Sequence, residues 1–371
     1  MYADFSEKLA KLAVRYSVDI QPGDTVFINA PTNAEELVRE VYREVIQAGG
    51  HVIFLNLTFP GQNEIFMRYA SKEQLKYVDP LTLELIRKVK KVINIFSSFN
   101  TRALTTIDPK RKKIRLEANK EQNKIFVERM AKKELQWVLC PYPCDAFAQE
   151  GNMGTQEYKE FVYKSLALDE TDPVEYWKFL EEEQDKIIRI LDKGKEFRVV
   201  GEDTDITLAI EGRKWINCCG HENLPDGEVF TAPHEDGVTG TVRFTFPGIY
   251  QGQEIENIFL KFKDGKVIDY DATKGKEFLS KVLEIENANI LGELAVGTNY
   301  GIQKFTKNML FDEKMGGTVH MALGFGFPES GSKNVSAIHW DILKDMKSQE
   351  SKIYLDNELI YQAGKWLIPK K

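Results

Sequence analysis

Residues 25–55 decide the fold of the first half of the chain, with the sequence TVFINAPTNAEELVREVYREVIQAGGHVIFL. The apolar runs 25–29 and 51–55 have the length and composition of buried strands. Between them, residues 35–47 place apolar side chains at helical spacing, and the glycine pair that follows ends the helix. Strand, helix and strand in this order form a βαβ unit, which predicts two parallel strands with a right-handed crossover.

Two further strands, 92–96 and 135–140, extend the predicted parallel sheet, and helices are expected at about 119–133 and 155–167. A long amphipathic helix follows the Asp172-Pro173 pair, in which an N-cap precedes a proline at the first helical position. After Phe197 the pattern changes to strands, which we expect at 197–201, 206–210, 228–231, 241–246, 258–262 and 266–270.

These patterns predict an α/β plus α+β fold in two domains. A chain of 371 residues is too long for one ordinary hydrophobic core. We expect an N-terminal α/β domain with a parallel βαβ sheet at residues 1–195. We expect a strand-rich C-terminal domain at residues 196–371, to which the candidate ligands described below belong.

Composition and charge exclude several classes of partner. With a formal net charge of −7, the chain lacks the concentrated basic face of nucleic-acid binders, and we expect the basic run at 110–113 to be a solvated turn. The longest aliphatic stretches are too short to cross a bilayer, so no membrane partner is expected. The cysteines match neither a disulfide framework nor a zinc knuckle, which favours reduced thiols and a cytoplasmic location.

Histidine is scarce, and four of the five copies lie between positions 221 and 339. In Ala337-Ile-His-Trp-Asp341, an extended strand would place His339 and Asp341 on one face and the apolar side chains on the other. In Thr318-Val-His-Met-Ala-Leu-Gly324, His320 is the one strongly polar side chain of an apolar segment. Histidines in such carboxylate-rich, apolar settings point to a metal site.

Two carboxylates complete a candidate ligand set. Glu228 begins an apolar strand, and Glu293 lies among leucine, alanine and glycine in the segment 291–299. Burying such carboxylates is costly unless they pair, accept hydrogen bonds or bind a cation. Three carboxylates and two histidines are too many for one tetrahedral zinc and suit two divalent ions about 3.5–4 Å apart, with one carboxylate bridging. Nitrogen and oxygen ligands without thiolate fit Zn, Co or Mn.

Each of these residues also has a structural interpretation. A lone buried histidine is commonly a core residue with its hydrogen bonds satisfied, and a lone glutamate is commonly on the surface. The metal hypothesis therefore depends on the joint occurrence of all five residues. His221 and His234 lie near Glu228 in the sequence and stay undecided as neighbours of the metal or of the substrate, whereas His51 is expected to be structural.

The same segments resemble those of the thermophilic metalloprotease family, the group of aminopeptidases T and S. The resemblance extends over the whole chain, and four motifs carry it in order and in approximate spacing: GEVFTAP at 227–233, LGE at 291–293 with GTN at 297–299, HMALG at 320–324, and IHWD at 338–341. It implies two divalent metals in each chain, removal of N-terminal residues from peptides, and a homodimer with its active site in a large internal cavity.

The resemblance also implies roles for individual residues. Glu293 would be the bridging ligand. The expected reaction is hydrolysis of the first peptide bond by a water that the metals activate. A nearby carboxylate, Glu293 or Glu235, would take the proton. The implied metal ligands are Glu228, Glu293, His320, His339 and Asp341.

One position departs from the family pattern. Family members have a tyrosine seven residues after the first ligand histidine, whereas this chain has Phe327. A phenol can coordinate a metal or donate a hydrogen bond to a developing oxyanion, and phenylalanine can do neither. Two alternatives to the aminopeptidase therefore stay open at this point: a metal-binding homologue with weak or altered peptidase activity, and a ligand-binding protein without chemistry.

Overall fold

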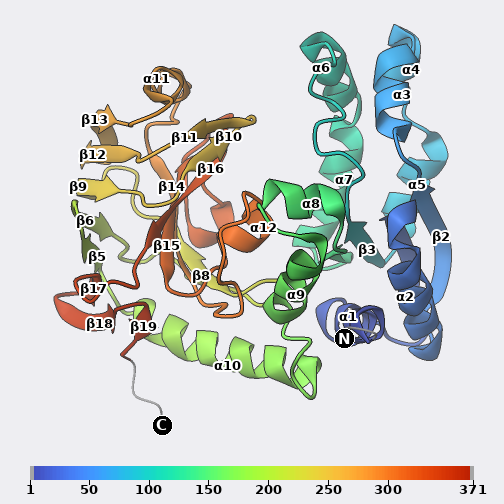
Figure 1. Ribbon diagram of the computed structural model, residues 1–371, viewed down its shortest axis with the longest axis horizontal. Coiled ribbons are helices and arrows are strands. Elements are labelled where there is room, and N and C mark those ends of the chain that lie inside the picture. The colour runs from blue at the N-terminus through green and yellow to red at the C-terminus, as the bar shows by residue number, and fades with distance from the viewer. Residues whose placement is uncertain (1–3, 368–371) are drawn as a thin grey trace. The chain divides into compact units, whose positions relative to one another are not determined.

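The structure, a computed structural model, describes residues 4–367. The chain divides into two compact units. Unit 1 runs to Tyr176 and includes Gly220–Pro225, whereas unit 2 contains Trp177–Cys219 and the chain from Asp226 onward. A parallel sheet in unit 1 and antiparallel sheets in unit 2 confirm the predicted fold class (Figure 1). The predicted domain boundary near residue 195 stays a prediction.

Unit 1 is built on the βαβ unit that residues 25–55 predict. Its four strands are parallel and lie in the order β2-β1-β3-β4. Helix α2 buries Leu37, Val41 and Val45, while Ile46 lies on its solvent side and is 52% exposed. The bounds are β1 Thr25–Pro31, α2 Glu35–Gln47, β2 His51–Thr58, β3 Lys91–Phe96 and β4 Gln136–Pro141.

The other helices of unit 1 include six α-helices that the sequence pattern did not predict, α1, α3 to α6 and α8. Helices α6 and α7 contain no fully buried residue. Because neither helix buries an apolar face fully, the apolar periodicity of its sequence is weak. The basic run at 110–113 lies in α6, so its prediction as a turn is wrong; Asp108 accepts a hydrogen bond from the Lys110 backbone and, with Pro109, starts a helix there. The bounds are α1 Phe5–Leu12, η1 Ala13–Ser17, η2 Thr32–Ala34, α3 Gln62–Tyr69, α4 Lys72–Lys76, α5 Pro80–Lys88, α6 Pro109–Ala118, α7 Lys120–Ala131, α8 Asp145–Glu150 and α9 Thr155–Ser165.

Helix α10, Pro173–Leu191, is the predicted long amphipathic helix, and the division between the units falls within it. No helix within residues 4–367 is long and apolar enough to span a membrane. The shorter elements of unit 2 are the hairpin β10 Gly248–Tyr250 and β11 Gln253–Ile255, with α11 Lys276–Leu283, α12 Met309–Asp312 and η3 Pro328–Ser330.

Unit 2 contains two large antiparallel sheets, which Figure 1 shows next to each other. The eight-stranded sheet has, in spatial order, β13 Lys266–Asp271, β12 Phe259–Lys263, β9 Val238–Arg243, β6 Thr204–Ala209, β5 Glu196–Gly201, β17 Lys352–Leu355, β18 Glu358–Gln362 and β19 Lys365–Trp366. The five-stranded sheet has β16 His339–Asp345, β15 Thr318–Gly324, β14 Leu291–Gly297, β8 Glu228–Thr231 and β7 Ile216–Cys218.

The two sheets of unit 2 share one hydrophobic core. Phe197 and Ile206 of the eight-stranded sheet and Leu294, Met321 and Ile342 of the five-stranded sheet belong to the same buried cluster. Because successive side chains of a strand point to opposite faces, the residues between these core positions lie on the other face of the five-stranded sheet. The core therefore determines which side chains of the five-stranded sheet lie on its other face and are available to form a site.

Leu294 tests the shared core. It is fully buried, so Leu294→Ala should lower the free energy of unfolding by about 2–5 kcal/mol, the usual cost of lost burial and a new cavity. Leu359→Ala is the matched control, because Leu359 lies in strand β18 of the same unit and is 38% exposed. Urea unfolding midpoints measure both variants. Equal, small shifts for the two would contradict a single core between the sheets.

Candidate metal centre

Five predicted residues come together on the face of the five-stranded sheet that points away from the core. On β16, His339 and Asp341 lie on this face, because Trp340 and Ile342 belong to the core. On β15, His320 lies between the core residues Val319 and Met321. The same alternation puts Glu228, at the start of β8, on this face, and Glu293 of β14 also lies on it.

A bulge places Glu293 on this face. Leu291 belongs to the core, so a regular strand would put Glu293 on the core side as well. The pairing of β14 with β15 shifts between Leu291 and Glu293, which inserts one extra residue, Gly292. A Cβ on Gly292 would lie 2.3 Å from the Phe325 carbonyl oxygen, so glycine is required for this close approach.

Small residues oppose the candidate ligands across the sheet. Ala322 of β15 pairs with Glu293 on one side and with Asp341 on the other. Similarly, Ala295 pairs with His320, Gly324 with His339, and Gly297 with Glu228. Short neighbours leave the long acidic and imidazole side chains free to converge above the sheet.

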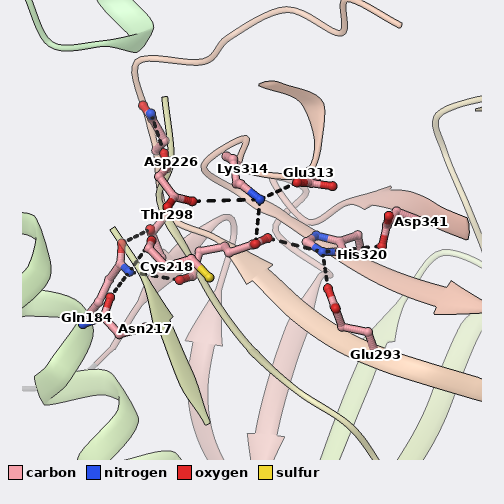
Figure 2. Close-up of polar contacts among 12 residues, drawn as sticks. Gln184, Asn217, Cys218, Asp226, Glu293, Thr298, Glu313, Lys314, His320 and Asp341 are labelled. Atoms are coloured by element: carbon pink, nitrogen blue, oxygen red, sulfur yellow. Dashed lines mark hydrogen bonds and ion pairs between the residues drawn. The ribbon is translucent and has the colours of Figure 1, made fainter. Parts of the chain in front are cut away.

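His320 is fully buried among carboxylates. Its Nε2 lies 3.0 Å from Glu293 Oε1, 3.3 Å from Glu228 Oε2 and 4.0 Å from Asp341 Oδ1. Figure 2 shows His320 between Glu293 and Asp341. One imidazole nitrogen thus faces three acidic oxygens, which is the environment of a bound cation.

His339 has a fixed orientation. Its Nδ1 lies 2.7 Å from the Phe325 carbonyl oxygen, which can only accept, so Nδ1 carries a proton and donates it. This leaves Nε2 to face the cluster, 3.3 Å from Asp341 Oδ1 and 3.7 Å from Glu293 Oε2. A backbone acceptor on one imidazole nitrogen is the usual way to orient the other toward a metal.

The mutual attraction of these groups shifts their pKa values. Burial lowers the pKa of His320, but Glu293, Glu228 and Asp341 raise it overall to about 9. Burial also lowers the pKa of His339, but the charges of Asp341 and Glu293 raise it overall to about 10. Burial raises the pKa of Asp341, but the two imidazoles lower it overall to about 2. Without metal, protons on the imidazoles therefore supply the positive charge that the carboxylates require.

Among the described residues, two of the three-residue groups with ligand atoms close enough to hold a metal ion share Glu293. One is Glu228, Glu293 and His320; the other is Glu293, His339 and Asp341, with the atoms of each group within 4.8 Å of one another. In addition, the buried oxygens Glu228 Oε2 and Asp341 Oδ1 accept no hydrogen bond from the described residues. Oxygen and nitrogen donors with unsatisfied buried carboxylate oxygens fit a divalent cation.

A buried lysine, which the sequence analysis did not single out, lies beside the cluster. Lys314 Nζ lies 2.7 Å from Glu228 Oε1 and 3.9 Å from Asp226 Oδ1, and it also contacts Glu313 (Figure 2). Burial lowers the pKa of Lys314, but these carboxylates raise it overall, well above its usual value, so the side chain is charged. The charged sequence Asp312-Glu313-Lys314 gave no sign of burial.

Gln184 of α10 holds the backbone beneath Glu228. It is fully buried, and its Nε2 donates to the carbonyl oxygens of Glu228 at 2.9 Å and Cys218 at 3.0 Å, and to Asn217 Oδ1 at 2.6 Å. Its Oε1 accepts from Thr298 Oγ1 at 2.7 Å (Figure 2). The start of β8 is thereby tied to the helix and to the end of β14, which fixes the origin of the Glu228 side chain.

The undecided residues have other partners. His234 Nε2 donates to the Glu211 carbonyl oxygen at 2.8 Å, and the His221 ring packs on Tyr16 in unit 1. His51 is exposed at the start of β2. Neither His221 nor His234 belongs to a group of possible metal ligands among the described residues.

Glu235, a predicted candidate base, holds a loop. It accepts hydrogen bonds from Arg213 Nη2 at 2.7 Å and from the Lys333 backbone at 2.6 Å. Burial raises its pKa, but these contacts lower it overall, so the carboxylate is ionised. Its contacts join Arg213 to the loop that precedes β16.

Phe327 lies beside a candidate ligand. Its ring centroid is 4.9 Å from that of His339, and Phe230 and Phe325 pack on its other sides at 5.6 and 5.8 Å. The position that departs from the family pattern is therefore next to the cluster, where an aromatic wall meets the His339 imidazole.

Comparison with known proteins agrees with this geometry. The sequence pattern of the family described as Thermophilic metalloprotease (M29) matches residues 4–366. The chain belongs to this metalloprotease family. Membership implies a divalent metal cofactor and confirms the resemblance that the four motifs indicated.

Similar relatives within the family span nearly the whole chain. Aminopeptidase 2 of Geobacillus stearothermophilus is 29% identical over 97% of each chain. Aminopeptidase T of Thermus aquaticus is 25% identical over 87% of this chain and 85% of its own. The structure of wild-type AmpT from Thermus thermophilus, at 23% identity, covers 99% of this chain and 100% of its own with a TM-score of 0.83, so the fold is shared.

The raised imidazole pKa values predict how the stability of the metal-free protein depends on pH. His320 and His339 have pKa values of about 9 and 10 in the folded chain, above the ordinary value of 6.5 expected after unfolding. Their contribution is fully present below pH about 6.5 and is lost as pH rises through about 9 to 10.

The melting temperature of the metal-free protein should therefore fall from pH 7 to pH 10. The fall should persist in His234→Ala, whose imidazole lies elsewhere, and shrink in His339→Ala. Thermal unfolding followed by circular dichroism measures all three proteins. A fall of the same size in His339→Ala and wild type would contradict the assigned electrostatics.

Proposed function

We propose that this chain is a metal-dependent aminopeptidase that removes N-terminal residues from peptides. One observation carries the proposal: two ligand groups that share Glu293 lie on one sheet face of a chain that belongs to a metalloprotease family. Relatives that match nearly the full chain are named aminopeptidases. A ligand-binding protein without chemistry is not favoured, because family membership and the orphaned buried carboxylate oxygens both point to a metal enzyme.

The proposed centre would hold two divalent ions, and Glu293, which belongs to both ligand groups, would be shared between them. The sharing of Glu293 by both groups supports this arrangement, and the absence of thiolate from them favours Zn, Co or Mn. When bound, two such ions provide a water of lowered pKa and polarise the scissile carbonyl. The ligands would be Glu228, Glu293, His320, His339 and Asp341.

The chain's own residues supply orientation and charge. His339 is held by the Phe325 carbonyl, and the surplus of carboxylates suits the positive α-amino group of a peptide with a free N-terminus. Glu293 and Glu235 stay candidates for the proton acceptor. Glu293 has the support of position, since it lies in the cluster and burial raises its pKa.

Assembly and location complete the proposal. A homodimer is supported by the exposed apolar side chains of edge strand β2, among them Phe54 and Leu57, because such edges are normally covered or charged. A cytoplasmic location is supported by the four cysteines, whose spacing matches no disulfide framework.

His339→Ala tests the metal centre. We expect wild type to bind two equivalents of Zn, Co or Mn and to release N-terminal residues from peptides, and His339→Ala to lose about one equivalent and nearly all activity. His234→Ala is the matched control and should retain both. Elemental analysis after dialysis, together with a peptide hydrolysis assay for each metal, gives the result. Metal-free wild type with full activity would overturn the proposed function.

Phe327→Tyr tests the departure from the family pattern. A hydrogen-bond donor to a developing oxyanion is worth about 10²–10³ in kcat, so restoring the phenol beside His339 should raise kcat by about tenfold or more. The number of metal equivalents bound by the protein should stay the same. Phe325→Tyr, on the neighbouring ring, is the control. Turnover that is unaltered in Phe327→Tyr would show that the missing phenol does not limit the reaction.

A further inference from the structure

Lys314 has an unusually constrained place for a lysine. It is 2% exposed and lies in the short connection between α12 and β15, the strand of His320. The backbone is fixed on both sides, since Lys314 N donates to the Phe311 carbonyl at 3.1 Å and its own carbonyl accepts from Asn299 N at 3.1 Å. Burying a lysine is costly unless its charge is paired, so the surrounding carboxylates must compensate.

Three carboxylates lie around the Lys314 ammonium. Glu228 Oε1 lies at 2.7 Å, Asp226 Oδ1 at 3.9 Å, and Glu313 Oε1 is in direct contact. Of the three, only Glu228 also belongs to the groups that contain Glu293. Glu228 is therefore the link between the lysine and the metal centre.

The two oxygens of Glu228 have different partners. Oε1 accepts the hydrogen bond from Lys314 at 2.7 Å. Oε2 points the other way, 3.3 Å from His320 Nε2, and accepts no hydrogen bond from the described residues. With one oxygen occupied, the carboxylate offers a single oxygen to the cluster.

The lysine also fills a third group of possible ligands. Cys218, Asp226 and Glu228 have donor atoms within 4.8 Å of one another, on the side of Glu228 where the ammonium lies. When ionised, five carboxylates surround the centre, and two divalent ions with one ammonium would balance them. The carboxylates are Asp226, Glu228, Glu293, Glu313 and Asp341.

We propose that Lys314 is a positioning residue of the metal centre: its ammonium holds Glu228 Oε1, so that Glu228 is a one-oxygen ligand, and it takes the place of a third cation. This inference rests on the proposed two-metal function. It assigns the lysine a role through Glu228 and no contact with the reacting atoms.

Cobalt binding tests this role without an activity assay. Lys314→Met removes the charge at similar length, and we expect its affinity for Co²⁺ to fall by about 10–100-fold, the usual effect of losing a partner that orients a metal ligand. The visible absorption of bound Co²⁺ should also change, because Glu228 is free to bind through both oxygens. Lys307→Met is the matched control. Lys307 lies in the loop before α12 and pairs with Glu254 of β11.

Lys314→Gln is a second variant in case the methionine variant does not fold. It removes the charge, and its shorter side chain no longer holds Glu228 Oε1, so the same loss of affinity and altered spectrum are expected. If Lys314 served only for stability, its substitution would lower the melting temperature of the metal-free protein. The Co²⁺ affinity and the absorption spectrum would then stay as in wild type, and this result would overturn the inference. Wild type that binds fewer than two Co²⁺ would instead contradict the proposed function.

Discussion

The structure of unit 2 depends on the burial of negative charge. Glu228, Glu293 and Asp341 lie on one face of a sheet with side chains that are at most 10% exposed. Carboxylates at such short distances repel one another, and burial has removed their hydration. The arrangement is therefore stable only with positive charge among them. Two imidazoles and one ammonium supply it in the metal-free chain, and divalent ions would supply it in the enzyme.

Other parts of unit 2 hold these buried carboxylates in place. A core shared by two sheets makes β14, β15 and β16 rigid, which holds ligand-bearing side chains in place more precisely than loops would. Gly292 inserts the bulge that turns Glu293 to the acidic face. Outside the cluster, Gln184 fixes the backbone of Glu228 and Lys314 fixes its side chain. The cost of burying charge is thus met by groups from separate parts of the chain.

Strand periodicity predicted the part of the site that one strand contains. His339 and Asp341 share a face because they lie two positions apart in a regular strand, with Trp340 between them. Periodicity could not predict the face of Glu293, because a bulge reverses it, and it gave no sign of Lys314, whose burial depends on contacts distant in sequence. The βαβ unit was predictable for a similar reason, as its helix buries an apolar face that local spacing reveals, whereas the weakly buried α6 lacks that signal.

The central claim is that the buried acidic face holds two divalent ions bridged by Glu293. Anomalous diffraction from crystals of the zinc-loaded protein, measured on both sides of the zinc absorption edge, tests it most directly. The account predicts two anomalous peaks about 3.5–4 Å apart, one near Glu228 and His320 and the other near His339 and Asp341. A single peak, or zinc located only on the Cys218 side of Glu228, would contradict it.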